Sequence, residues 1–249
     1  MRFTALALLS GGLLFGQAAD TAARQPARQV DWVRLGYYKE ITPERWKSRV
    51  EQMLRQDAQN PPKKEAVMFV GSATIAGWDL KHYFPQFETI NRGIGGSMIS
   101  ESTYYADQLV VPFKPSTIVF YSGDNDTAYG MPNEMIADDF RKFVTKIHAA
   151  LPDTQMVVIA IRPSIARLAV WDAVQAANEQ MRAICAKDSK LQFVDLTQML
   201  LTADGQPRRE LLREDLHHLN KDGFDLVSPV VAKAVQAAED RHGRGHGRS

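Results

Sequence analysis

The feature that most constrains the fold of this chain is a regular alternation of short apolar runs with longer segments of helical periodicity. The apolar runs have the length of strands and hold few polar residues, which is typical of strands buried on both faces of a parallel sheet. They occupy residues 66–70, 117–121, 156–161 and 191–196, with a shorter run near 89–90. Apolar residues recur at helical spacing over 42–60, 136–147, 169–184 and 224–237. This order predicts an α/β protein in which helices cover both faces of a parallel sheet.

Chain size and charge narrow the choice of partners. The 249 residues, 45% of them hydrophobic, suit one domain, which we place at residues 31–240. The 30 Lys and Arg residues nearly balance the 29 Asp and Glu residues, so the formal charge of +1 provides no reason to expect nucleic acid as a partner. We expect a small-molecule partner, and the sequence leaves the oligomeric state open.

Both ends of the chain are predicted to lie outside this domain. Residues 1–19 begin with Met1-Arg2, continue through an apolar run and end on small residues, as a cleavable secretory signal does. That run is too short to cross a bilayer, so no stable membrane span is expected. Residues 20–30 are predicted to be a disordered linker and residues 241–249 a disordered tail. We therefore expect an exported protein, either periplasmic or secreted.

Four segments with polar residues or glycines follow predicted strands or precede the last helix. They cover residues 71–74, 90–97, 121–126 and 215–220. Because ligands of parallel α/β sheets bind at the carboxyl ends of the strands, we expect these segments to meet at one site. Each segment taken alone is also common in ordinary turns.

The residue types in these segments fit acyl-transfer chemistry. Glycines in 90–97 allow a backbone N–H to approach a ligand, and the side-chain amide of Asn125 is a neutral donor that can stabilise negative charge on oxygen. Asp215 precedes His218 by three residues, a spacing that can bring the carboxylate to the imidazole of a general base. His217 is the adjacent competitor, with a less suitable offset of two residues.

Together the four segments resemble, in order and over almost the whole mature chain, the motif blocks of the SGNH (GDSL-type) ester hydrolases. The resemblance implies a three-layer, flavodoxin-like α/β/α fold with a five-stranded parallel sheet, and no metal or organic cofactor. It implies an oxyanion hole formed by Gly96, Asn125 and the backbone N–H of Ala73, with His218 as base and Asp215 orienting it. The implied reaction is hydrolysis of acyl esters through a covalent acyl-enzyme.

The first block departs from the family pattern at two positions. Ser72 stands where the family has aspartate, and Ala73 stands where it has the nucleophilic serine. A methyl group cannot attack a carbonyl carbon. Ser72 is a candidate substitute nucleophile, although its side chain should point elsewhere than that of its neighbour, and Thr74 and Ser97 are further candidates. Alternatively, His218 activates water directly, or Ala73 was introduced into an active enzyme.

Two hypotheses of different kinds follow. The first is an exported hydrolase of acyl or acetyl esters of lipids or glycans, with Ser72 or a restored serine as nucleophile. The second is a non-catalytic relative that binds an acylated ligand in the same crevice, and a related transferase is a third option. Arg162 ends a predicted strand and could contact an anionic substrate group. Trp78 could wall an acyl pocket or pack in the core instead.

Overall fold

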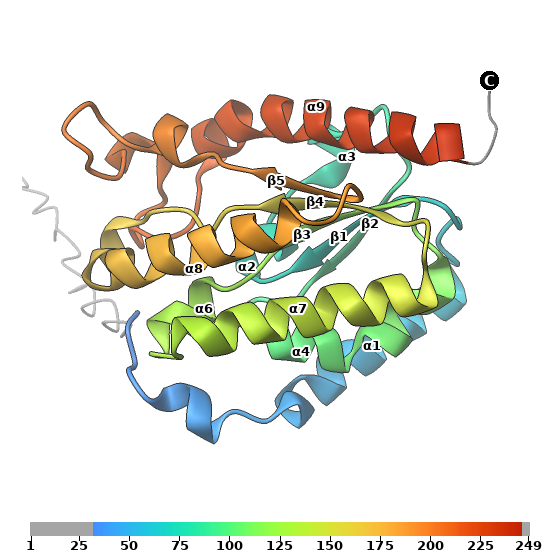
Figure 1. Cartoon of the computed structure of the whole chain (residues 1–249), viewed down its shortest axis with the longest axis horizontal. Helices are drawn as coiled ribbons and strands as arrows, with labels where there is room; N and C mark the ends of the chain where they lie inside the picture. Colours follow the sequence, from blue (N-terminus) through green and yellow to red (C-terminus); the bar gives the residue numbers. More distant parts are fainter. Residues whose placement is uncertain (1–31, 246–249) are drawn as a thin grey trace, which may run out of the picture. The chain divides into compact units, whose positions relative to one another are not determined.

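A parallel sheet forms the centre of the molecule (Figure 1). The computed structural model describes residues 32–245, and in this range five parallel strands pair in the order β2-β1-β3-β4-β5. The strands are β1 (Val67–Gly71), β2 (Thr89–Gly93), β3 (Thr117–Tyr121), β4 (Gln155–Ile159) and β5 (Leu191–Val194). The predicted α/β fold with a five-stranded parallel sheet is confirmed.

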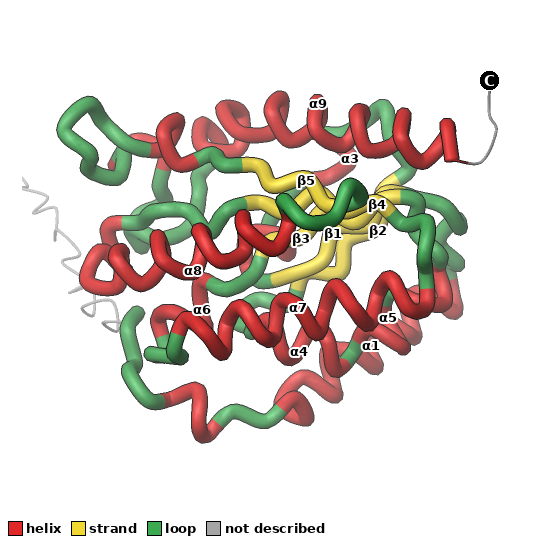
Figure 2. The backbone as a smooth tube through the Cα atoms, in the orientation of Figure 1, coloured by secondary structure: helices red, strands yellow, loops and turns green. Residues whose placement is uncertain are grey.

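Helices cover both faces of the sheet, as Figures 1 and 2 show. One face packs against α1 (Lys47–Gln59), α4 (Ile99–Tyr104), α5 (Ala106–Leu109), α7 (Asn133–Ala150) and α8 (Trp171–Cys185). The other face packs against α2 (Ala73–Ala76), α3 (Leu80–Tyr83) and α9 (Lys221–Gly245). A short helix, α6 (Asp124–Ala128), follows β3. None of the helices in the described range is long and apolar enough to cross a membrane.

Side chains of the central strands alternate between the two cores. Phe120 of β3 is fully buried with Phe140 and Phe143 of α7, whereas Val119 and Tyr121 face the side of α9. All five positions of β1, β3 and β4 are buried, which explains why these strands appear in the sequence as continuous apolar runs.

The strand order locates the ligand crevice. Since β1 lies between β2 and β3, the chain leaves β1 towards one side of the sheet and leaves β3 towards the other. Ligands of open α/β sheets bind at such a switch point, beyond the carboxyl ends of the strands. Residues 72–73 and 122–125 follow these two strand ends directly.

The structure corrects two predictions outside the crevice. The expected tail from residue 241 is helical through Gly245, because Arg241 is held by Gln155 and Gln192 at 3.2 Å each. Trp78 is 4% exposed and lies in the core rather than in a pocket wall, with its indole N–H donating to Ser228. The predicted signal segment and linker, residues 1–30, lie outside the described residues.

The last residue of β1 packs so closely on β3 that only glycine fits. A Cβ built on Gly71 would lie 1.8 Å from the carbonyl oxygen of Tyr121, at a φ of +143° that L-residues rarely adopt. We predict that Gly71→Ala lowers the free energy of unfolding by at least about 3 kcal/mol. Urea unfolding followed by circular dichroism measures this. Gly243→Ala is the control, since nothing lies within 4 Å of that position, and a loss confined to Gly71→Ala is expected.

Candidate active site

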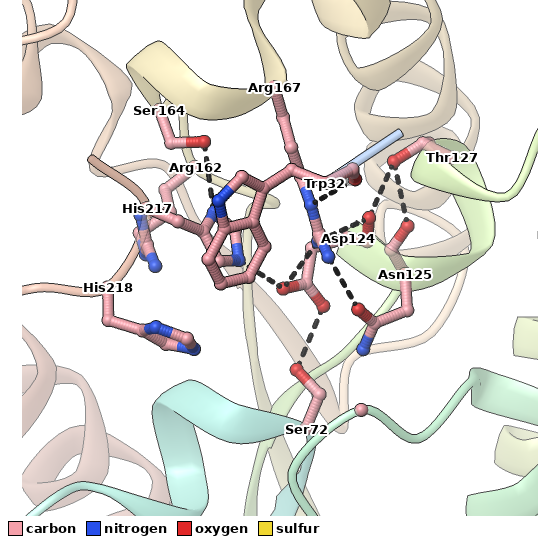
Figure 3. Close-up of polar contacts among 12 residues, drawn as sticks. Trp32, Ser72, Asp124, Asn125, Thr127, Arg162, Ser164, Arg167, His217 and His218 are labelled. Atoms are coloured by element: carbon pink, nitrogen blue, oxygen red, sulfur yellow. Dashed lines mark hydrogen bonds and ion pairs between the residues drawn. The ribbon is translucent and has the colours of Figure 1, made fainter. Parts of the chain in front are cut away.

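A buried carboxylate, Asp124, connects three of the four sequence motifs (Figure 3). The Ser72 hydroxyl of the first motif donates to Oδ1 of Asp124 at 2.8 Å. Nε2 of His217, in the fourth motif, lies 3.6 Å from Oδ2, and Nη1 of Arg167 lies 3.3 Å from the same oxygen. Asn125, next to Asp124, donates from its amide to the carbonyl of Ser97 in the second motif at 2.9 Å. The motifs that the sequence analysis expected to meet do meet.

His218 and Asp215 form the expected pair. Nδ1 of His218 lies 2.7 Å from Oδ2 of Asp215, and the backbone N–H groups of His217 and His218 both donate to Oδ1 at 2.9 Å. Because a carboxylate only accepts, Nδ1 carries a proton and Nε2 presents its lone pair. Burial acts to raise the pKa of Asp215, but these hydrogen bonds outweigh it and lower that pKa to about 2. An imidazole held in this way can accept a proton on Nε2.

A neighbouring arginine sets the orientation of the Asn125 amide. Nη2 of Arg167 donates to Oδ1 of Asn125 at 2.8 Å, so the oxygen of the amide is identified and Nδ2 is the donor end. One hydrogen of Nδ2 goes to Ser97, and the described residues provide no acceptor for the second. This second N–H can serve a ligand oxygen.

The glycine loop before α4 is anchored by an ion pair. Arg45 donates from Nη2 to the carbonyl of Gly96 at 2.9 Å and pairs with the buried carboxylate of Glu101. Glu101 in turn accepts from the backbone N–H of Met98. A Cβ on Gly95 would lie 3.8 Å from the Ala73 methyl group, so this loop and the start of α2 are neighbours. Ala73 is the first residue of α2, where a backbone N–H has no carbonyl partner within the helix.

The hydroxyl groups around the start of α2 are all buried. Ser72 is 0% exposed, Thr74 6% and Ser97 1%. Ala73 alone among residues 71–75 is partly exposed, and it bears only a methyl group. Figure 3 shows the Ser72 hydroxyl directed at Asp124 rather than at His218.

The sequence analysis gave no role to Asp124, and it also missed three site residues outside the four motifs. The Trp32 ring lies 4.9 Å from that of His217 and 5.7 Å from that of His218, measured between centroids, and its carbonyl accepts from Nε of Arg167. Arg167 and Arg45 are the other two. No motif surrounds Trp32 or Arg45, so only their contacts reveal them. Arg167 is five residues beyond Arg162, and a search for cations after strand ends would have found it.

The other expected features are placed as follows. Arg162, which follows β4, is 6% exposed, and its positive charge contributes to the lowered pKa of His217. Within the described residues no group of three or more His, Cys, Asp or Glu side chains is arranged to hold a metal ion.

The histidine next to His218 is neutral because it is buried. Burial lowers the pKa of His217 to about 4, and the positive charges of Arg162 and Arg167 act in the same direction. The hydrogen bond and charge of Asp124 act to raise this pKa but are outweighed. For Asp124, burial acts in the raising direction, but His217, Arg167 and Ser72 hold the pKa well below its usual range. The proton of neutral His217 therefore sits on Nε2, facing the carboxylate, and Nδ1 accepts from the Ser164 hydroxyl at 3.0 Å.

This burial predicts a pH dependence of stability. Between pH 6.5 and about 4 the unfolded chain binds a proton at residue 217 that the folded chain does not, so the free energy of unfolding falls as the pH falls. The contribution is at most about 1.4 kcal/mol per pH unit. His217→Gln should give a flatter profile in urea unfolding at pH 7, 6 and 5. The exposed His82→Gln is the control, and equal slopes for all three proteins would contradict the prediction.

Comparisons with known proteins agree with this fold. The profile of the GDSL-like Lipase/Acylhydrolase family matches residues 36–226. A GDSL-like lipase from Bacteroides thetaiotaomicron VPI-5482 has a similar structure, with a TM-score of 0.66 and 19% identity, covering 76% of this chain and 98% of that one. The lipase/acylhydrolase from Enterococcus faecalis has a TM-score of 0.60 and 15% identity, covering 70% and 96%.

A carbohydrate esterase family 3 protein from Talaromyces cellulolyticus has a TM-score of 0.57 and 18% identity, covering 70% of this chain and 98% of that one. At these identities the solved structures show a shared fold alone. A comparison with curated proteins finds no match. Since the family profile spans most of the sequence, the chain belongs to the GDSL-like Lipase/Acylhydrolase family.

Proposed function

We propose that this protein binds the acyl group of an ester in the crevice beyond β1 and β3, and that the natural chain does so without a serine nucleophile. The family supports an ester-hydrolase-like function with a small acyl substrate. In this proposal the second N–H of Asn125 and the backbone N–H groups of Ala73 and Gly96 receive the carbonyl oxygen, while His218 stands beside the carbonyl carbon. The ligand is an acyl or acetyl ester of a lipid or glycan.

One observation carries the non-catalytic part of the proposal. The accessible side chain at the start of α2 is the methyl group of Ala73, whereas the hydroxyls on either side, Ser72 and Thr74, are buried. For Ser72 to attack an ester, its hydroxyl would have to leave Asp124 and turn out of the core, and a buried carboxylate would lose a hydrogen bond worth about 1.5–3 kcal/mol. This argues against Ser72 as the substitute nucleophile.

Slow hydrolysis remains a second candidate activity. The His218 and Asp215 pair is intact, and the His218 side chain is 25% exposed, so a water molecule can reach it. In serine hydrolases that lack their nucleophile, the remaining groups still accelerate the reaction about 10³ to 10⁴-fold over water.

We also propose that the protein works outside the cytoplasm, supported by the signal-like residues 1–19.

Restoring the missing hydroxyl tests the proposal. We predict that Ala73→Ser raises the turnover of 4-nitrophenyl acetate by at least about 100-fold over the natural chain, because the base and the oxyanion donors are already in place. The double variant Ala73→Ser/His218→Ala should lose that gain. Release of nitrophenol gives the rate, and circular dichroism checks folding.

Two outcomes would contradict this assignment. A folded Ala73→Ser variant without activity towards any short-chain ester would mean that the crevice is not an ester site. Rapid turnover by the natural chain that is abolished by Ser72→Ala, with the fold retained, would identify Ser72 as the nucleophile and the protein as an active hydrolase.

A further inference from the structure

Arg162 is a buried arginine with one complete edge unused. It follows β4 at the carboxyl end of the sheet, and the only hydrogen bond of its side chain in the described part of the chain is a long one, 3.5 Å from Nη1 to the carbonyl of Pro163. Its Nε and Nη2 atoms are both buried and have no partner there. Buried donors of this kind are rare in folded proteins, because each loses its hydrogen bonds to water.

The two unused nitrogens are the pair that binds oxyanions. In a guanidinium the Nε–H and one Nη2–H bond point in the same direction, so that together they match the two oxygens of a carboxylate. Arg167 in the same site shows the contrast, since its Nε, Nη1 and Nη2 all have partners within the protein. Arg162 thus presents a two-pronged donor that the protein itself does not fill.

The charge of Arg162 is also uncompensated. Within the described residues no carboxylate lies within 4.0 Å of its guanidinium, and the nearby Asp124 is engaged by Ser72 and Arg167. A histidine carries no negative charge, so His217 cannot compensate the guanidinium, and Asp215 pairs with His218. A buried and unpaired cation is unfavourable in the ligand-free protein and becomes favourable when an anion binds.

The position of Arg162 links this edge to the proposed acyl site. Its positive charge reaches His217, whose ring centroid is 4.7 Å from that of His218. Figure 3 shows Arg162 and the two histidines on the same side of Asp124. An anion on Arg162 would therefore lie near the ester carbonyl that His218 is proposed to face.

We propose that the ligand of this crevice is an ester that also carries an anionic group, such as a second carboxylate, and that Arg162 binds this group through Nε and Nη2. This inference rests on the proposed acyl-binding function and specifies its ligand class. Since both nitrogens are buried in the ligand-free fold, an anionic group can reach them only if the neighbouring side chains move.

The test compares a neutral and an anionic ester in the Ala73→Ser background. The substrates are 4-nitrophenyl acetate and mono-4-nitrophenyl succinate, and the measured quantity is the ratio of their kcat/KM values. Ala73→Ser should favour the succinate, and adding Arg162→Met should lower the ratio at least about tenfold, as expected when a charged hydrogen-bonded pair is lost. Arg162→Lys should give an intermediate ratio, because it keeps the charge but not the fork. Arg55→Met, an exposed arginine of α1, is the matched control and should leave the ratio unchanged.

A second measurement uses the natural chain and does not depend on activity. Calorimetric titration should show that succinate binds and that succinamide does not, with binding lost in Arg162→Met. Titration with inorganic phosphate shows whether a tetrahedral anion is accepted as well. If Arg162→Met does not fold, Arg162→Lys and a crystal structure of the natural chain with succinate serve instead.

The outcomes separate the two proposals. Equal ratios with and without Arg162, or a crystal structure at saturating succinate with only water on Nε and Nη2, would overturn the role of Arg162 and leave the acyl site standing. If the Ala73→Ser variant hydrolyses neither ester although succinate binds at Arg162, the result would instead count against the acyl site.

Discussion

The buried carboxylate of Asp124 is the interaction on which the site depends. It receives the Ser72 hydroxyl from the end of β1, the Arg167 guanidinium from the segment after β4 and the edge of His217 from the loop before α9. A carboxylate that is 3% exposed is stable only when it is surrounded by donors. The contacts of Asp124 therefore hold three chain segments, which are far apart in sequence, together at the carboxyl ends of the central strands.

This arrangement explains how the site can persist with an alanine at position 73. Ser72, Asp124 and Arg167 join chain segments together, and Arg167 also orients Asn125, so these residues stabilise the fold whether or not an ester is cleaved. The Ala73 side chain joins no chain segments in this way. Its side chain is partly exposed and makes no polar contact, so a hydroxyl and a methyl group at this position differ in chemistry and little in packing. A methyl group at position 73 is therefore compatible with an intact crevice.

Much of the fold could be predicted from sequence, because strands buried on both faces give short apolar runs that alternate with longer helical patterns. Four of the five expected strands have bounds within two residues of the observed ones, and the short run near 89–90 extends to Gly93. The errors arose where a local pattern was outweighed by distant contacts. Trp78 follows the first motif, yet its ring packs with Phe69, Phe84 and Phe224 in the core beneath α9. The Gly-rich end of the chain is helical through Gly245, where local propensity alone favoured disorder.

By itself the sequence determined the class of sheet, the order of the motifs and the absence of a hydroxyl at position 73, since all three depend on residue type and spacing along the chain. Only the tertiary structure decided which side chains reach the crevice. The Ser72 hydroxyl donates to Asp124, 52 residues away. The Nε and Nη2 atoms of Arg162 have no hydrogen-bond partner within the described residues, whereas all three side-chain nitrogens of Arg167 have one. These outcomes depend on the direction of each side chain and on partners from other strands, and residue spacing carries no information about either.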